Sequence, residues 1–406
     1  MFTRSIRSGL LTLGGVSVPR AVETLHLLLT GSTGTGKTTA FEELLGGIVG
    51  RGDRAIVCDP NGGYLSQYGG DGDVLLNPFD ARSPGWSIFS EMRRDYDAER
   101  LACSVVPDGH GEGAAWHHYA QVLLAEVIRA LLRRGEASTE RLLHWSTVAP
   151  AQELGGLLAG TPAAGLFDPD AAKALASTRF IVAAHLTPHR YVRPGDFSLR
   201  HWLESSSGSL YLTWRADMQA ALAPLIATWV DVLASAVLSL PPDPDRRIWL
   251  LVDELAALGK LGSMESALTL GRKHGLAVVA GLQSTAQLDR IYGADSSIIL
   301  RACFRNLLIL GIAKSDPDTC ETMSRALGER EVLRAQESRS TGSQGTSRSV
   351  NALREQERLV MPSEIANLPN LAGYLALAGD APVVPIRLTP QRRARPVAPY
   401  LEQPLC

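Results

Sequence analysis

Residues 25–40 read Leu25-His-Leu-Leu-Leu-Thr-Gly31-Ser-Thr-Gly-Thr-Gly36-Lys37-Thr38-Thr39-Ala40. A short apolar run ends at Leu29, a loop of the form G-x-x-x-x-G-K-T follows, and residues compatible with a helix come next. A strand, this loop and a helix in that order form the context in which the motif binds phosphate groups. The stretch therefore predicts a phosphate-binding loop with a nucleotide as its ligand.

The residue types of the loop suit phosphate binding. Glycine allows backbone N–H groups to turn inward around phosphate oxygens, because no Cβ stands in the way. The helix that follows adds the positive end of its dipole. We expect Lys37 to reach the β and γ phosphates and the hydroxyl of Thr38 to ligate Mg²⁺. The predicted nucleotide-binding residues of the loop are Gly31, Ser32, Thr33, Gly34, Thr35, Gly36, Lys37, Thr38 and Thr39.

Two acidic residues follow an apolar run much later in the chain. The run from Ile248 to Val252 ends abruptly in Asp253 and Glu254. A strand that ends in two acids is a weak signal alone, but it gains weight downstream of a phosphate-binding loop. We expect Asp253 to hold Mg²⁺ directly or through water, and Glu254 to orient and deprotonate an attacking water molecule.

Gln283 follows another predicted strand, Leu276 to Leu282. At the carboxyl end of that strand, its amide is placed to sense a γ-phosphate through water. The alternative is a polar capping residue before Ser284. We favour the sensor role.

Arg272 precedes the same strand, in the run Gly271-Arg-Lys. A strand from Leu276 to Leu282 spans roughly 23 Å, which exceeds the reach of one side chain. Arg272 is therefore expected to serve the nucleotide of a neighbouring subunit as an arginine finger. The alternatives are a surface salt bridge for Arg272, and Arg301 or Arg305 as the finger.

Asp59 follows a third predicted strand, Arg54 to Cys58, and begins the run Asp59-Pro-Asn-Gly. Sheets in α/β proteins place ligands at the carboxyl ends of their strands. Asp59 is therefore a candidate to assist Mg²⁺ or phosphate positioning. A plain Pro-Asn-Gly turn explains the same residues equally well, and both interpretations stay open.

Composition limits the class of protein. The chain has 406 residues, of which 45% are hydrophobic, enough for a full core and for two domains. The formal net charge is −2, so any contact with nucleic acid must come from local or assembly-level patches. The 5 cysteines contain no C-x-x-C pair, which excludes a zinc ribbon and indicates a reducing compartment.

Strand and helix signals divide the chain into segments. We expect an α/β nucleotide-binding domain over residues 1–84 and 192–390. An all-α domain is expected to interrupt it over residues 85–191, where helical periodicity replaces the strand signals. The Ser/Gly/Arg-rich segment 336–350 is expected to be a mobile loop, and the Pro/Arg-rich tail 391–406 is expected to be disordered.

Residues 220–240 are long and apolar enough to span a membrane. They contain Pro224 and Asp231 and lie between two predicted strands, so a buried crossover helix is the better interpretation. No secretory signal is visible, and the chain as given looks soluble.

Together these motifs resemble those of the conjugative type IV coupling proteins, the TrwB- and TraD-like family. The resemblance extends over nearly the whole chain. Besides the phosphate-binding loop, it is carried by Asp59-Pro-Asn-Gly, Leu76-Asn-Pro-Phe-Asp80, Gly85-Trp-Ser, Trp214-Arg-Ala-Asp-Met218, Val252-Asp-Glu-Leu, Gly271-Arg-Lys, Gly281-Leu-Gln-Ser-Thr and Val360-Met-Pro-Ser-Glu-Ile.

The resemblance implies a RecA-like P-loop domain that carries an all-α domain and assembles as a homo-hexameric ring. Family members couple ATP hydrolysis to the movement of DNA, single- or double-stranded, and its attached relaxase into a type IV secretion channel. ATP and Mg²⁺ are the implied cofactors. The implied roles are phosphate and metal binding for Lys37 and Thr38, the acid pair for Asp253 and Glu254, the sensor for Gln283 and the finger for Arg272.

Family members begin with membrane-spanning helices that anchor the ring at the cytoplasmic face of the bacterial inner membrane. No segment of this sequence matches those helices. The chain is therefore expected to be either a truncated soluble part or a protein whose anchor another polypeptide supplies.

Two other functions stay open at this level. A double-stranded DNA translocase of the FtsK or HerA kind shares the same core, but the helical insertion and the family-specific runs favour a coupling protein. A docking platform would use nucleotide binding to fix a ring that recruits relaxase with little hydrolysis, and an intact Glu254 argues against it. A GTPase is disfavoured because the sequence has no N-K-x-D motif.

Overall fold

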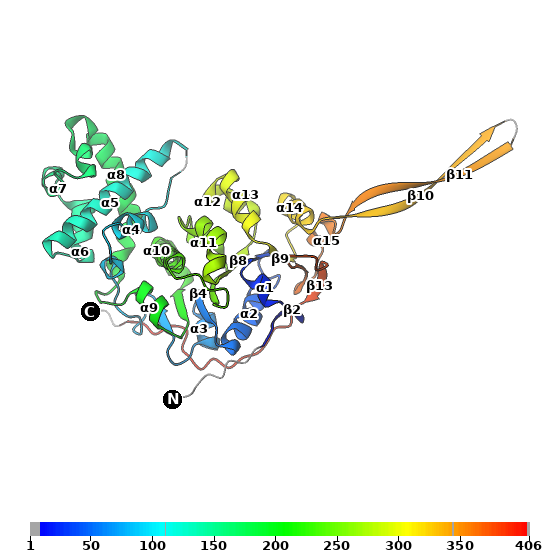
Figure 1. The fold of residues 1–406 in the computed structure, drawn as a ribbon, viewed down its shortest axis with the longest axis horizontal. Coiled ribbons are helices and arrows are strands. Elements are labelled where there is room, and N and C mark those ends of the chain that lie inside the picture. The colour runs from blue at the N-terminus through cyan, green and yellow to red at the C-terminus, as the bar shows by residue number, and fades with distance from the viewer. Residues whose placement is uncertain (1–8, 110, 343–344, 404–406) are drawn as a thin grey trace.

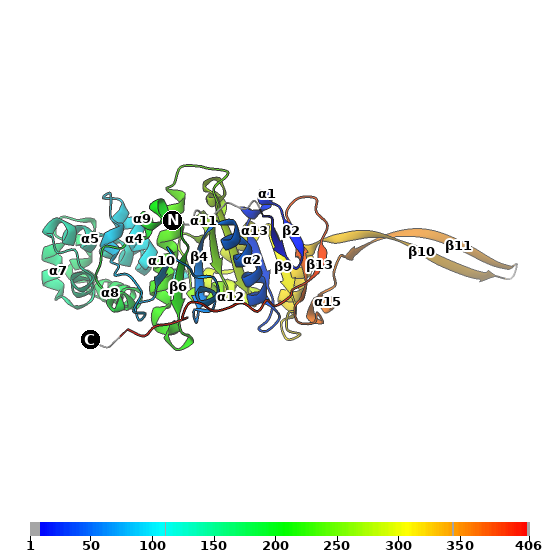
Figure 2. The same cartoon turned by 90° about the horizontal axis from the view of Figure 1, so that it is seen from below.

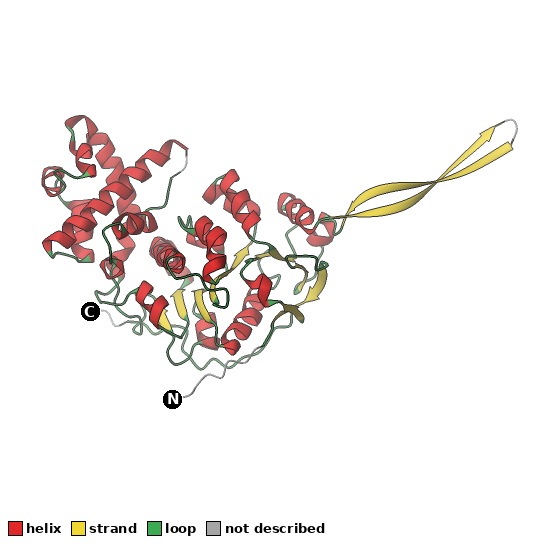
Figure 3. Cartoon of the chain, viewed as in Figure 1, coloured by secondary structure: helices red, strands yellow, loops and turns green. Residues whose placement is uncertain are grey.

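The computed structural model describes residues 9–109, 111–342 and 345–403, and for Glu112, 335–342 and 345–353 it describes the backbone alone. At its centre is a nine-stranded sheet in the order β13-β12-β9-β3-β8-β7-β4-β6-β5. An all-helical region lies at one end of the molecule and a two-stranded ribbon projects from the other (Figure 1). Figure 3 shows the helices on both sides of the sheet. The α/β fold class predicted from the sequence is confirmed.

Most of the sheet is parallel. In spatial order, its strands are β13 (Val384–Arg387), β12 (Ala372–Ala376), β9 (Asn306–Leu310), β3 (Leu27–Thr30), β8 (Leu276–Leu282), β7 (Ile248–Val252), β4 (Arg54–Pro60), β6 (Leu210–Trp214) and β5 (Val74–Leu76). From β9 to β5 neighbours pair parallel, whereas β12 and β13 pair antiparallel. The residues that follow β3, β7 and β8 therefore lie at the same edge of the sheet.

The central strands are apolar because helices cover both of their faces. Every residue of β3, β6, β7 and β8 is buried. Such strands have continuous apolar runs rather than an alternating pattern. The strands predicted over 54–58, 248–252 and 276–282 are all present.

The first face of the sheet carries the helix of the phosphate-binding loop. Its elements are the hairpin β1 (Leu11–Leu13) and β2 (Val16–Val18), then α1 (Arg20–Glu23), α2 (Lys37–Arg51) and α3 (Gly63–Tyr68). Their core joins Phe41 of α2 to Leu29 and Leu251 of the sheet. β1 and β2 pair antiparallel as a hairpin.

The second face is covered by helices from later in the chain. These are α9 (Leu199–Ser205), α10 (Gln219–Leu238), α11 (Met264–Leu270), α12 (Thr285–Tyr292) and α13 (Ala294–Cys303), with short helical turns at 216–218, 255–258 and 271–274. Two more helices, α14 (Pro317–Leu327) and α15 (Pro362–Ala366), form a small core with Ile309 of β9.

The region between β5 and α9 contains helices and no strand among its described residues. They are α4 (Asp97–Val105), α5 (Ala114–Arg134), α6 (Thr139–Leu143), α7 (Ala151–Leu157) and α8 (Ala172–Leu186), with short helical turns between them. The two connections of this region lie side by side, because Trp86 N donates to Arg193 O at 3.0 Å and Phe197 N to Gly85 O at 3.2 Å. This supports the proposed division near residues 85 and 191. The region shares one continuous core with the second face of the sheet.

The long apolar helix predicted over 220–240 is a buried crossover helix. Among the described residues, Ala216–Leu238 is the one helical segment long and apolar enough to cross a membrane. However, 72% of the most apolar stretch of this segment is buried inside the protein. It packs between the sheet and the helical region, as its position between β6 and β7 requires.

Residues 336–350 were expected to form a mobile loop. The described residues of that segment form strands instead. β10 (Glu329–Gly342) and β11 (Gly345–Arg358) pair antiparallel along their whole length and form the ribbon that leaves the body in both views (Figure 2). Ser, Gly and Arg suggested a loop by composition. Composition carries no information about the register in which two such segments pair.

Residues 391–406 were expected to form a disordered tail. Residues 391–403 instead contact the rest of the protein, and residues 404–406 lie outside the described residues. The tail runs back along the first face of the sheet. Arg393 lies 4.9 Å from the centre of the Tyr68 ring. Near its end, Leu401 N donates to Asp80 Oδ2 at 3.0 Å, and Ala81 N donates to Leu401 O at 2.9 Å. These partners are remote in sequence, so the Pro/Arg composition could not reveal them.

A buried histidine at the start of β3 makes the stability of the fold depend on pH. Val278 N donates to His26 Nδ1 at 3.1 Å, and the other ring nitrogen lies 2.9 Å from Leu268 O. Burial lowers the pKa of His26 to about 4. The folded state therefore prefers neutral His26, and this stabilisation is complete above the ordinary pKa and is lost as the pH falls toward 4.

We predict that His26→Gln reduces the dependence of the unfolding free energy on pH between 6.5 and 4. One titrating group contributes at most about 1.4 kcal/mol per pH unit. Denaturant unfolding at several pH values measures this slope. His118→Gln is the control, since His118 is exposed. An unchanged slope in His26→Gln would contradict the assignment.

Candidate active site

The phosphate-binding loop lies between β3 and α2, and its first residues are tied to neighbouring strands. Gly31 N donates to Leu282 O at 3.1 Å, and Ser32 N donates to Gly311 O at 2.9 Å. The hydroxyl of Thr35 donates to Ser32 O at 2.7 Å. Gly31, Ser32 and Thr35 therefore hold the loop in shape, and none of the three lines the cavity described below.

Glycine is required at position 36 for two reasons. Its φ is 118°, in the left-handed region that side chains rarely adopt. A Cβ would also lie 2.9 Å from Leu371 Cδ2. Leu371 is held there because its N–H donates to Thr35 O at 2.9 Å. The C-terminal part of the chain thus packs against the turn into α2.

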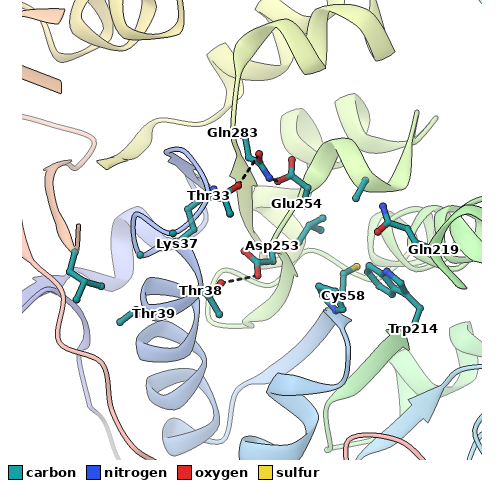
Figure 4. Close-up of a pocket in the computed structure, with 16 residues that line it drawn as sticks. Thr33, Lys37, Thr38, Thr39, Cys58, Trp214, Gln219, Asp253, Glu254 and Gln283 are labelled. Carbon is teal, nitrogen blue, oxygen red and sulfur yellow. Dashed lines mark hydrogen bonds between the residues drawn. The ribbon is translucent and has the colours of Figure 1, made fainter. Parts of the chain in front are cut away.

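A cavity of about 560 Å³ opens at the carboxyl edge of the sheet (Figure 4). It brings together residues from separate parts of the chain. Its lining consists of Thr33, Gly34, Gly36, Lys37, Thr38, Thr39, Cys58, Pro60, Trp214, Gln219, Val252, Asp253, Glu254, Ala257, Gln283 and Leu371. The structure therefore joins most of the predicted loop residues with both predicted acids and the predicted sensor.

Lys37 places its ammonium group inside the loop. Nζ donates to Gly31 O at 2.5 Å and to Ser32 O at 3.3 Å. Burial lowers the pKa of Lys37, while the carboxylates of Glu254 and Asp253 act in the opposite direction. The side chain is thus a buried cation between the loop and the two acids, which is where it can neutralise phosphate oxygens.

Asp253 and Thr38 form the candidate metal site. The Thr38 hydroxyl lies 3.5 Å from Asp253 Oδ2, and burial raises the pKa of Asp253. A hydroxyl and a carboxylate are hard oxygen ligands of the kind Mg²⁺ prefers. No cluster of three His, Cys, Asp or Glu that could hold a metal exists in the part of the chain that the structure describes. A site with so few protein ligands is compatible with Mg²⁺, because this ion usually keeps waters and phosphate oxygens in its coordination shell.

Glu254 is oriented by Gln283, which is oriented in turn by the loop. Gln283 Nε2 donates to Glu254 Oε2 at 2.6 Å, and the Thr33 hydroxyl donates to Gln283 Oε1 at 3.3 Å. Glu254 Oε1 is buried and has no hydrogen-bond partner among the described residues. Burial raises the pKa of Glu254, which makes its carboxylate a better proton acceptor. The free oxygen is therefore suited to take a proton from a water molecule.

Arg272 does not join this group. It lies in the turn before β8, whereas Gln283 follows that strand, so Arg272 is at the amino end of β8 and Gln283 at its carboxyl end. Its side chain is exposed and is not part of the cavity lining. Of the rival arginines, Arg301 pairs with Asp289 at 3.3 Å. The expectation that Arg272 cannot reach the nucleotide of its own subunit agrees with this geometry.

The side chain of Asp59 lies outside the cavity lining. Its carboxylate is fully buried and accepts hydrogen bonds from Tyr64 N at 3.1 Å and from Leu65 N at 2.7 Å. These are the free N–H groups at the start of α3. Burial raises the pKa of Asp59 to about 7. Asp59 therefore caps the start of α3.

Seven lining residues were missed as site residues in the sequence: Cys58, Pro60, Trp214, Gln219, Val252, Ala257 and Leu371. Trp214 and Gln219 lie at the end of β6 and the start of α10, next to β4. The run Trp214-Arg-Ala-Asp-Met218 at the end of an apolar strand was a usable signal. Leu371 had none, because its part in the site depends on its left-handed φ of 68° and its contact with Gly36.

Comparisons with known proteins agree with this geometry. A family model described as type IV secretion-system coupling protein DNA-binding domain matches residues 10–389. The coupling protein TraD of Escherichia coli (strain K12) is 29% identical over 406 aligned residues, which cover 95% of this chain and 55% of TraD. The chain thus spans about half the length of this curated relative.

Solved structures extend the likeness to the fold. The bacterial conjugative coupling protein TrwBdeltaN70 in its unbound monoclinic form has 46% sequence identity and a TM-score of 0.92, over 98% of this chain and 93% of that one. TrwB in complex with ADP and Mg²⁺ has the same identity and a TM-score of 0.90, over 98% of this chain and 93% of that one.

The predicted RecA-like P-loop fold is thereby confirmed. Both the family model and the structural relatives cover nearly the whole described chain. The chain belongs to the family of type IV secretion-system coupling proteins.

Proposed function

We propose that this chain is an ATP-hydrolysing motor that moves DNA, with an attached relaxase, into a type IV secretion channel during conjugation. One observation carries the proposal. The phosphate-binding loop, the acid pair Asp253 and Glu254, and Gln283 converge on one cavity at the carboxyl edge of the sheet. Membership of the coupling-protein family supports DNA transfer as the process that this ATP hydrolysis drives.

ATP and Mg²⁺ are the proposed cofactors. TrwB has been solved in complex with ADP and Mg²⁺ and with the non-hydrolysable ATP analogue ADPNP. The buried Lys37 ammonium and the oxygen ligands of Thr38 and Asp253 in this chain fit the same pair of ligands. Bound Mg²⁺ would neutralise charge on the phosphate oxygens.

The proposed mechanism gives each polar side chain one task. Lys37 and the backbone N–H groups of the loop hold the β and γ phosphates. Thr38 and Asp253 hold the metal. Glu254 orients a water molecule through its free oxygen and takes its proton as the water attacks. Gln283 keeps the other Glu254 oxygen in place, and its contact with Thr33 couples this orientation to the loop.

Partners follow as further proposals. DNA, single- or double-stranded, is the proposed cargo, with a relaxase and the channel proteins as protein partners, at the cytoplasmic face of the bacterial inner membrane. With a net charge of −2, the chain must contact DNA through local basic surfaces. A homo-hexameric ring is the proposed assembly, and Arg272 is the proposed finger for the nucleotide of the neighbouring copy.

The first test measures steady-state ATP hydrolysis against protein concentration, with and without DNA, and uses Glu254→Gln as the blank. We expect the specific activity to rise with both, because a ring shares its active sites between copies. Activity that is flat in both, in a protein that still binds nucleotide, would favour the docking platform instead. Sizing the protein with ADPNP and DNA identifies the assembly in either case.

Lys37→Ala should weaken the binding of a triphosphate by about 10- to 100-fold, because the variant loses a buried charge-assisted contact to phosphate. Equilibrium binding of ADPNP measures this loss. Lys173→Ala is a matched control, since Lys173 is exposed in the helical region. Unchanged binding in Lys37→Ala would contradict the site.

Arg272→Ala should leave nucleotide binding by a single chain unchanged but lower DNA-stimulated hydrolysis by about a thousandfold or more, the usual contribution of an arginine finger. Its exposed neighbour provides the control Lys273→Ala.

A mixing experiment tests whether Arg272 acts between copies. Arg272→Ala chains retain Glu254, and Glu254→Gln chains retain Arg272, so a mixed ring contains some complete sites. Activity should therefore reappear when the two inactive variants are combined. A mixture as inactive as its components would show that Arg272 does not act in a neighbour's site.

A further inference from the structure

Tyr64 contacts the candidate metal site from outside the predicted motifs. It lies in the first turn of α3, after the run Asp59-Pro-Asn-Gly, and is 4% exposed. Its hydroxyl donates a hydrogen bond to Asp253 Oδ2 at 2.8 Å. Tyr64 does not line the cavity, so it reaches the site only through the side chain of Asp253.

The tyrosine ring is fixed from two directions. Asp59 caps the first turn of α3 through hydrogen bonds from Tyr64 N and Leu65 N. On its other side, the ring packs against Phe41 of α2, with ring centres 6.4 Å apart. The backbone and the ring of Tyr64 are therefore held by contacts that do not involve Asp253. This explains why Asp59 is buried so near the site without touching the cavity.

The Tyr64 hydroxyl is the shorter of two contacts at the same oxygen. The Thr38 hydroxyl approaches Oδ2 only to 3.5 Å. Within the described residues, no hydrogen bond reaches Oδ1 of Asp253. One carboxylate oxygen is thus anchored, and the other stays available to a metal ion or its water.

We propose that Tyr64 is a positioning residue for magnesium, which fixes the Asp253 carboxylate in the orientation that holds the Mg²⁺ of the bound nucleotide. The proposal rests on the proposed function, since it concerns the same site. Residues that hydrogen-bond to a metal ligand tune metal affinity by about 10- to 100-fold without touching the metal. Tyr64 would act on Mg²⁺ in this way, whereas a ring that only fills space would not.

The test separates the hydroxyl from the ring. Tyr64→Phe removes the donor and keeps the aromatic packing against Phe41. Tyr68→Phe is the matched control, because Tyr68 lies in the same helix and its hydroxyl donates to Glu42 O at 2.7 Å, away from Asp253. Thermal unfolding of both variants checks that they fold.

The measurement is equilibrium binding of a fluorescent ADP derivative, in EDTA and during titration with Mg²⁺. We expect Tyr64→Phe to bind the nucleotide in EDTA as tightly as the unmodified protein. The Mg²⁺ concentration needed to tighten binding should rise by about tenfold. Tyr68→Phe should match the unmodified protein in both conditions. The same Mg²⁺ titration curve for Tyr64→Phe and the unmodified protein would overturn the proposal.

A double-mutant cycle tests whether Tyr64 acts through Asp253. In the Asp253→Ala background, adding Tyr64→Phe should leave the Mg²⁺ dependence unchanged, because the carboxylate that it positions is gone. A further rise of similar size would mean that Tyr64 acts by another route.

The unmodified protein distinguishes failure of this proposal from failure of the proposed function. If it binds no nucleotide, or if Mg²⁺ has no effect on its binding, the nucleotide site itself is wrong and the inference falls with it. If Mg²⁺ tightens its binding and Tyr64→Phe does not alter the effect, only the role of Tyr64 is overturned.

Discussion

The parallel pairing of β3 with β8 is the constraint on which the site depends. Thr30 pairs with Leu282, and the ladder continues into the loop, where Gly31 N donates to Leu282 O at 3.1 Å. This register sets the phosphate-binding loop beside Gln283. β7 pairs with β8 on its other side and brings Asp253 and Glu254 to the same edge. A slip of one residue would turn each of these side chains to the opposite face of the sheet.

Burial on both faces makes that register strict. The core of the first face joins the sheet to α2 and α3, and the core of the second face continues without interruption into the helical region. The helical region is thus attached through a shared core as well as through two chain connections. That shared core includes residues of β7, the strand that carries the acids, and of α10.

The C-terminal segment packs against the phosphate-binding loop and against the start of α3. Leu371 packs against Gly36, and its N–H bonds to the loop. Further along, the backbone at Pro399 packs so closely on Gly62 that a Cβ there would lie 2.2 Å from its carbonyl oxygen. Gly62 begins the helix that carries Tyr64. Both ends of this segment therefore contact elements that position phosphate or metal ligands.

The sequence by itself determined the phosphate-binding loop, the acid pair, Gln283 and most strands, because each is encoded by residues that are close together in the chain. The family resemblance rested on the same local runs. Only the tertiary structure decided which long-range partners the side chains find. Asp59 caps α3, Tyr64 reaches Asp253, and Leu371 and Trp214 line the cavity. Residues 336–342 pair with 345–351, and the tail contacts Asp80. Local sequence sets the conformation a segment prefers, whereas these contacts depend on register and packing between segments remote in the chain.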